Sequence, residues 1–109
     1  MSILDKIRKA RETEAEAGGR KFTIRRPTDE EAMQFGNSGL LEIVKKFVIG
    51  WELTELDLIP GGDGVAVKFD PELFAEWVAD QPEVWDPLGT SILNAYKAHT
   101  DKRDAALKN

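Results

Sequence analysis

One continuous stretch, residues 47–85, most constrains the fold, because apolar runs, turns and helix caps follow one another there with few residues between them. It begins with an apolar helix end that leads to Trp51 and continues through a Gly-rich turn at residues 61–64. A short strand, a proline-opened helix carrying Trp77 and a third tryptophan, Trp85, follow. Nothing in this order has the spacing of an active site. The stretch therefore predicts a small packed core with recognition surfaces around it.

Length, cysteine content and charge set the outer limits. With 109 residues the chain is the size of one domain and can bury a modest core. The absence of cysteine excludes disulfides and thiolate metal sites. A formal net charge of −5 opposes general binding to nucleic acid, whose phosphates require a basic surface. No apolar run is long enough to span a bilayer, and the N-terminus lacks the apolar core of a secretory signal, so we expect a cytoplasmic protein.

We predict an N-terminal helical arm at residues 1–19 and a single globular domain at residues 20–109. Ser2 can cap a helix that continues to Ala17, with a narrow apolar face near its start. Gly18 and Gly19 then end the helix. Two interpretations stay open: a partly frayed arm, or an arm that docks on a partner or on a second copy of the chain.

Caps and apolar periodicity predict the next elements. Alternation at residues 20–26 indicates a short strand. Thr28 and Glu31 have the spacing of a capping box, which opens a helix. Ser38 is the predicted cap of the following helix, whose apolar face continues to Trp51, with Gly50 as its stop.

The C-terminal half predicts one more strand and two helices. Alternation at residues 65–69 indicates a strand, which pairs either with the strand at residues 20–26 or with residues before the Gly-rich turn. Asp70 caps a helix, and the last helix begins at Pro82 or at Asp86. Together the elements predict an α+β class, predominantly helical with four to five helices and a small two- or three-stranded antiparallel sheet.

The residues that could carry chemistry have simpler explanations. His99, the one histidine, has no identifiable partner in the sequence and is interpreted as a surface or helix-end residue. The basic cluster is either an exposed strand edge, a partner of the acidic helix start at residues 29–31, or a nucleic-acid contact. It consists of Arg20, Lys21, Arg25 and Arg26. We expect no enzyme activity, no cofactor, no metal, no membrane contact and no nucleic-acid partner.

Three quoted segments carry a resemblance to a known family. They are FTIRRPTDEEA at residues 22–32, FVIGWELTELDLIPGG at residues 47–62, and VKFDPELFAEWVADQPEVWDPL at residues 67–88. With them the chain resembles the tail assembly chaperones of long-tailed bacteriophages, over most of its length from residue 22 onward. The resemblance implies a mostly helical, non-catalytic protein that keeps the tape measure protein soluble and helps tail tube subunits gather around it, in the cytoplasm of the bacterial host.

The resemblance has two further implications. Many such genes produce a longer form by a reading-frame slip, and the end Lys108–Asn109 can be encoded as AAA AAC, on which ribosomes slip.

No motif identifies the partner contacts. We hypothesise an apolar face with Leu53, Leu56 and Trp85, because aromatic residues at a rim often anchor interfaces. Trp51 and Trp77 are assigned to the core. Self-association stays open. The alternative function is a head–tail connector or tail-completion subunit that remains in the virion.

Overall fold

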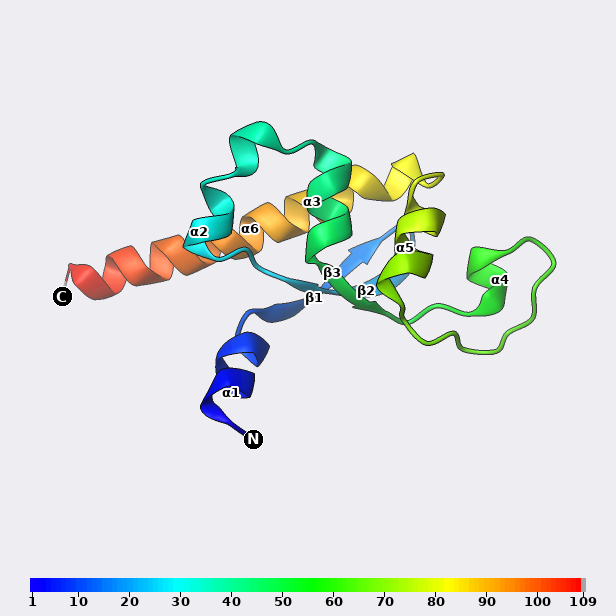
Figure 1. Ribbon diagram of the computed structural model, residues 1–109, viewed down its shortest axis with the longest axis horizontal. Helices are drawn as coiled ribbons and strands as arrows, with labels where there is room; N and C mark the ends of the chain where they lie inside the picture. Colours follow the sequence, from blue (N-terminus) through cyan, green and yellow to red (C-terminus); the bar gives the residue numbers. More distant parts are fainter. Residues whose placement is uncertain (109) are drawn as a thin grey trace.

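A three-stranded antiparallel sheet with helices packed on one face forms the chain in the computed structural model, which describes residues 1–108 (Figure 1). The elements in chain order are α1 (Ile3–Lys9), β1 (Glu12–Ala17), β2 (Arg20–Arg25), α2 (Asp29–Ala32), the 3₁₀ helix η1 (Phe35–Asn37), α3 (Leu40–Phe47), β3 (Val48–Trp51), α4 (Glu55–Leu58), α5 (Pro71–Val78) and α6 (Pro82–Leu107). This confirms the predicted α+β class. Of the six α-helices in the described residues, α2 and α4 are single turns. Asn109, part of the Lys–Asn end, lies outside the described residues.

The helix predicted to continue to Ala17 ends at Lys9, and this part of the sequence interpretation is wrong. The residues that follow form β1, which pairs antiparallel with β2 and places Ala15 opposite Phe22. Both alanines of β1 are buried, whereas its glutamates are exposed. Burial against the sheet therefore overrides the high helix propensity of Glu and Ala.

Gly18 and Gly19 form the turn of this hairpin rather than the end of a helix. Their φ angles are +59° and +74°. Positive φ at both central residues is what a two-residue type I′ turn requires, and glycine adopts it without steric cost. The signal that sequence reasoning missed is thus a Gly-Gly pair flanked by period-two alternation.

The prediction that the next helix continues toward Trp51 is also wrong for its last turn. It ends at Phe47, and Val48–Trp51 form β3, which pairs antiparallel with β2 so that β2 is the central strand. A Cβ atom at Gly50 would lie only 3.2 Å from the Cβ of Thr23 on β2. Gly50 therefore allows two strands to approach closely and does not act as a helix stop.

One predicted helix cap is confirmed and another is wrong. The capping box is present, since the backbone N–H of Glu31 donates to Thr28 Oγ1 at 3.1 Å and that of Thr28 donates to Glu31 Oε1 at 3.0 Å. Ser38 does not cap α3. Its hydroxyl donates to the carbonyl of Gln34 at 3.2 Å, and Gly39 occupies the N-cap position. The hydroxyl thus bonds back to the turn before η1 instead of to α3.

The hydrophobic core lies between the sheet and the three helices α3, α5 and α6 (Figure 1). Phe22 and Ile24 of the central strand contribute two of its fully buried side chains. The other core residues are Ala15, Ala17, Val44, Phe47, Val48, Leu53, Phe74, Trp77, Val78, Val84, Leu88 and Ile92. Since every element from β1 to α6 except the single turns α2 and α4 and the 3₁₀ helix η1 supplies a buried residue, one core holds the domain together.

Residues 65–69 do not form the predicted strand. A single isolated bridge joins Ala66 to Thr54, so the segment pairs with residues before the Gly-rich turn, which is the second of the two predicted alternatives. The position beside β2 is taken by β3. The indole N–H of Trp51 donates to the carbonyl of Val67 at 2.8 Å and ties this extended segment to the sheet.

The Gly-rich turn packs closely against Glu55 at Gly62, which leaves no room there for a side chain. Gly62→Ala is expected to destabilise the protein by about 1–3 kcal/mol, because overpacking costs energy of that order and the new Cβ would lie 2.7 Å from the carbonyl oxygen of Glu55. Gly64→Ala is the matched control, since nothing lies within 4 Å of its Cβ position. Urea unfolding of both variants measures the difference, and equal stabilities would contradict the prediction.

The two C-terminal helices begin where caps and prolines predict. Asp70 caps α5, with the N–H of Leu73 donating to its carboxylate at 3.1 Å, and Pro71 occupies the first turn. α6 begins at Pro82, the earlier of the two predicted starts, and Pro87 lies within it. α6 is the longest element, and its last turns extend beyond the rest of the domain (Figure 1).

Candidate docking surfaces

The three residues predicted to contact a partner lie in different environments. Leu53 is only 2% exposed and belongs to the core, so it cannot contribute to an exposed face. Leu56, on α4, is 58% exposed. Trp85 is half-buried, packs against the core, and its indole N–H donates to the carbonyl of Val78 at 2.7 Å. The structure therefore leaves Leu56 as the most accessible of the three, and Trp85 chiefly connects α6 to α5.

The segment around α4 exposes more apolar surface than the sequence indicated. Ile59 and Val65 are exposed along with Leu56, and these three residues are called the α4 patch. Backbone bonds from Leu56 to Asp63 and from Glu55 to Val65 fold this segment onto itself. Sequence reasoning missed Val65 as a surface residue because the alternation at residues 65–69 predicted a strand with a buried side.

The N-terminal helix α1 has an apolar face that no other part of the described chain covers. Ile3, Leu4 and Ile7 form this α1 face, and Ile3 is 71% exposed. None of the residues of α1 is buried, and the helix projects away from the domain (Figure 1). The rest of the helix is charged, so α1 is amphipathic. Isolated helices of this length are marginal in water, because most helical stability in proteins comes from packing an apolar face. A partner that covers the α1 face would supply that packing.

Two of the four residues of the basic cluster, Arg20 and Arg25, form ion pairs. Arg25 donates two hydrogen bonds to the carboxylate of Glu31, at 2.7 and 2.8 Å, and Lys46 lies 3.5 Å from the same carboxylate. The hydrogen bonds from Arg25 lower the pKa of Glu31 to about 2. Arg20 lies 3.4 Å from Asp57. The contact of Arg25 favours, for that residue, the predicted alternative in which the cluster pairs with the acidic helix start at residues 29–31, whereas Arg20 pairs with Asp57 outside it.

A second polar cluster joins the start of α2 to the second half of α6. Asp29 accepts hydrogen bonds from the Tyr96 hydroxyl at 2.8 Å and from Arg103 at 2.5 Å. The hydrogen bond from Tyr96 and the charge of Arg103 lower the pKa of Asp29. His99 lies 3.8 Å from the same carboxylate. The predicted surface histidine thus sits at the edge of a cluster that anchors α6.

The described residues were also compared with the requirements of a metal site and of a membrane-spanning helix, and they meet neither. Within residues 1–108, no three side chains of the metal-binding types are grouped so as to hold an ion. Over the same residues, no helix combines the length and apolar composition needed to cross a membrane. Comparison with protein-family models, curated proteins and solved structures found no match.

Proposed function

We propose that this chain is a phage tail assembly chaperone that binds the tape measure protein and assists tail tube assembly without catalysis, in the cytoplasm of the bacterial host. The observation that carries the proposal is the exposed α1 face on an otherwise well-packed domain. An amphipathic helix without its packing surface is suited to a helical, aggregation-prone partner, because two such helices can cover each other's apolar faces.

The three segments that resemble the chaperone family support the proposal through the fold. They supply Phe22 and Ile24 on β2, Phe47 to Leu53 around β3, and most of the buried side chains of α5 and the start of α6. The resemblance therefore rests on residues that build the core. The α1 face lies outside all three segments, whereas Leu56 and Ile59 of the α4 patch lie inside the second.

Recovery of partners from cells is the direct test of the proposed function. The tagged chain is expressed with its whole native gene neighbourhood, captured, and read by mass spectrometry. We expect recovery of a very long helical protein, with or without a C-terminally extended form of this chain, and absence of the chain from purified particles. Recovery of capsid or connector proteins, together with presence in the particles, would instead establish the alternative of a structural subunit.

Substitution in α1 tests which surface does the binding. The double variant Ile3→Asn, Ile7→Asn is expected to weaken partner capture about tenfold or more, because burying each isoleucine side chain contributes about 1.5–3 kcal/mol. Its melting temperature should stay within error of the parent, since both residues are exposed in the free domain.

The controls separate the α1 face from the other apolar surfaces. Leu107→Asn removes an equally exposed apolar residue at the far end of α6 and should leave capture unchanged. Leu56→Asn reports on the α4 patch. If Leu56→Asn abolishes capture and the α1 double variant does not, the α4 patch and not the α1 face is the docking surface. Trp85→Ala is a poorer test, because it also removes the bond to Val78 that connects α5 and α6.

A further inference from the structure

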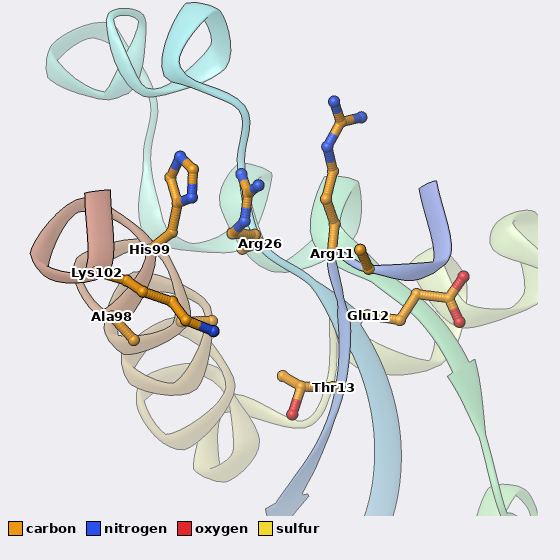
Figure 2. A pocket seen from close by; sticks show the side chains of 9 residues that line it. Arg11, Glu12, Thr13, Arg26, Ala98, His99 and Lys102 are labelled. Carbon is orange, nitrogen blue, oxygen red and sulfur yellow. The ribbon is translucent and has the colours of Figure 1, made fainter. Parts of the chain in front are cut away.

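A basic pocket of about 360 Å³ lies between the open end of the β1–β2 hairpin and the second half of α6 (Figure 2). Ala95 and Ala98 form its wall on α6, and their small side chains leave the space open. The remaining lining residues are Ala10, Arg11, Glu12, Thr13, Arg26, His99 and Lys102. Three positively charged residues from three separate segments therefore line one pocket, and Figure 2 shows the guanidinium of Arg11 directed away from Lys102.

Two of these charges, Arg11 and Arg26, form a like-charged pair across the hairpin. The N–H of Arg26 donates to the carbonyl of Arg11 at 2.8 Å, which extends the pairing of β1 with β2 by one position. Side chains alternate along strands, so Arg11 and Arg26 continue the row that includes Thr13 and Ile24, on the face of the sheet that α6 covers. Like charges directly opposite each other destabilise a sheet. Placement of two arginines there calls for a compensating negative charge.

Residues 1–108 supply no such charge in direct contact with either arginine. No ion pair within residues 1–108 joins Arg11, Arg26 or Lys102 to a carboxylate. The carboxylate of Asp29 attracts Arg26 through its charge, but it is already engaged by Tyr96 and by Arg103.

Arg11 and Arg26 also have few hydrogen-bond partners. The Nε atom of Arg11 is buried without a hydrogen-bond partner. Arg26 donates one bond, to the carbonyl of Pro27 at 3.1 Å. Burial and the charge of Arg11 lower the pKa of Arg26, as expected for an arginine that lacks a counter-ion. Glu12 lines the pocket, but Figure 2 shows its carboxylate directed away from Lys102 and His99.

We propose that this pocket is a binding site for an oxyanion group, phosphate or carboxylate, attracted by the positive charges of Arg11, Arg26 and Lys102. Guanidinium groups bind both kinds of group through paired hydrogen bonds, and a lysine adds a third charge at the opposite wall. The volume falls within the range of small-molecule sites, so it also accommodates part of the molecule that carries the group. This site is separate from the α1 face and does not depend on the proposed function.

Nuclear magnetic resonance titration of the full chain tests the site. Sodium phosphate and sodium acetate are added in separate experiments, with chloride adjusted to hold the ionic strength constant. We expect saturable shifts at the side chains of Arg11, Arg26 and Lys102 with at least one of the two anions, and the tighter of the two identifies the preferred group. Arg26→Gln should weaken this binding about tenfold, because a hydrogen bond between charged groups is lost. Lys68→Ala, which removes one exposed charge elsewhere, should not.

Thermal unfolding supplies a readout that a merely structural role would not produce. In chloride, Arg11→Gln should raise the melting temperature by a few degrees, since like-charge repulsion across the hairpin is removed. The same variant should lose the extra stability that phosphate or acetate confers on the parent. Absence of saturable shifts with both anions, or equal weakening by Lys68→Ala, would overturn the proposal. Arg11→Gln serves as the second variant if Arg26→Gln fails to fold.

Discussion

Phe22→Ala is expected to lower the free energy of unfolding by about 3–5 kcal/mol, the usual cost of removing a fully buried phenylalanine. Phe22 is 2% exposed and lies in the middle of the central strand. Its ring lies 6.2 Å from the rings of both Phe74 and Trp77, measured between centroids. Loss of this side chain would leave a cavity where the sheet meets α5. Because small domains have about 5–15 kcal/mol of stability in total, a large part of it would be lost.

Urea unfolding followed by tryptophan fluorescence measures this loss, since Trp77 packs against Phe22. Phe35→Ala is the matched control. Phe35 is half-buried in η1, at the edge of the core against Phe47 and Tyr96, so its removal should cost less. An equal or larger loss for Phe35→Ala would show that the centre of the core lies elsewhere than at β2.

Acid is expected to remove the stabilisation that the charged carboxylate of Glu31 contributes. The pKa of Glu31 is lowered from 4.5 to about 2, first by the hydrogen bonds from Arg25. Because the folded pKa lies below the unfolded one, this stabilisation is fully present above pH 4.5 and is lost as the pH falls from 4.5 toward 2. The side chain is 18% exposed, so solvent screening reduces the effect to about 1–2 kcal/mol.

Glu31→Gln isolates the charge from the cap, because glutamine can still accept the hydrogen bond from the N–H of Thr28. Unfolding free energies of parent and variant, measured from pH 7 to pH 2, should differ by about 1–2 kcal/mol at pH 7 and converge near pH 2. Glu30→Gln, at the exposed neighbouring position, should give a curve parallel to that of the parent. A constant difference between Glu31→Gln and the parent across the whole range would mean that the ion pair with Arg25 does not stabilise the fold.

Local sequence patterns predicted the parts of this protein whose structure depends on near neighbours. The Thr28–Glu31 capping box, the Asp70–Pro71 start of α5 and the strand at β2 all follow from residues within three or four positions of one another. Each such signal satisfies or aligns backbone groups at short range. For that reason the caps and the central strand could be predicted before any packing was known.

Tertiary contacts decided between helix and strand for the segments whose local sequence is compatible with both. The alternation of Glu and Ala in residues 12–17 is compatible with a helix, and burial of Ala15 and Ala17 against α6 makes it a strand. Val48–Trp51 continue the apolar face of a helix, but they pair with β2, because that completes the hydrogen bonds of the central strand. The sequence pattern alone cannot distinguish a helix from a strand in these two segments, since so few residues fit both the helical period and the strand period.

The candidate sites depended even more on the folded chain. Leu53 and Leu56 lie three positions apart in one apolar stretch, yet one is in the core and the other on the surface, because only the packed segments around them determine what is covered. The basic pocket unites Arg11, Arg26 and Lys102 from three places in the sequence. Sequence by itself determined the class, the caps at Thr28 and Asp70 and the amphipathic character of α1. Only the tertiary structure decided which apolar and charged side chains remain without partners, because burial is set by distant segments and not by neighbours along the chain.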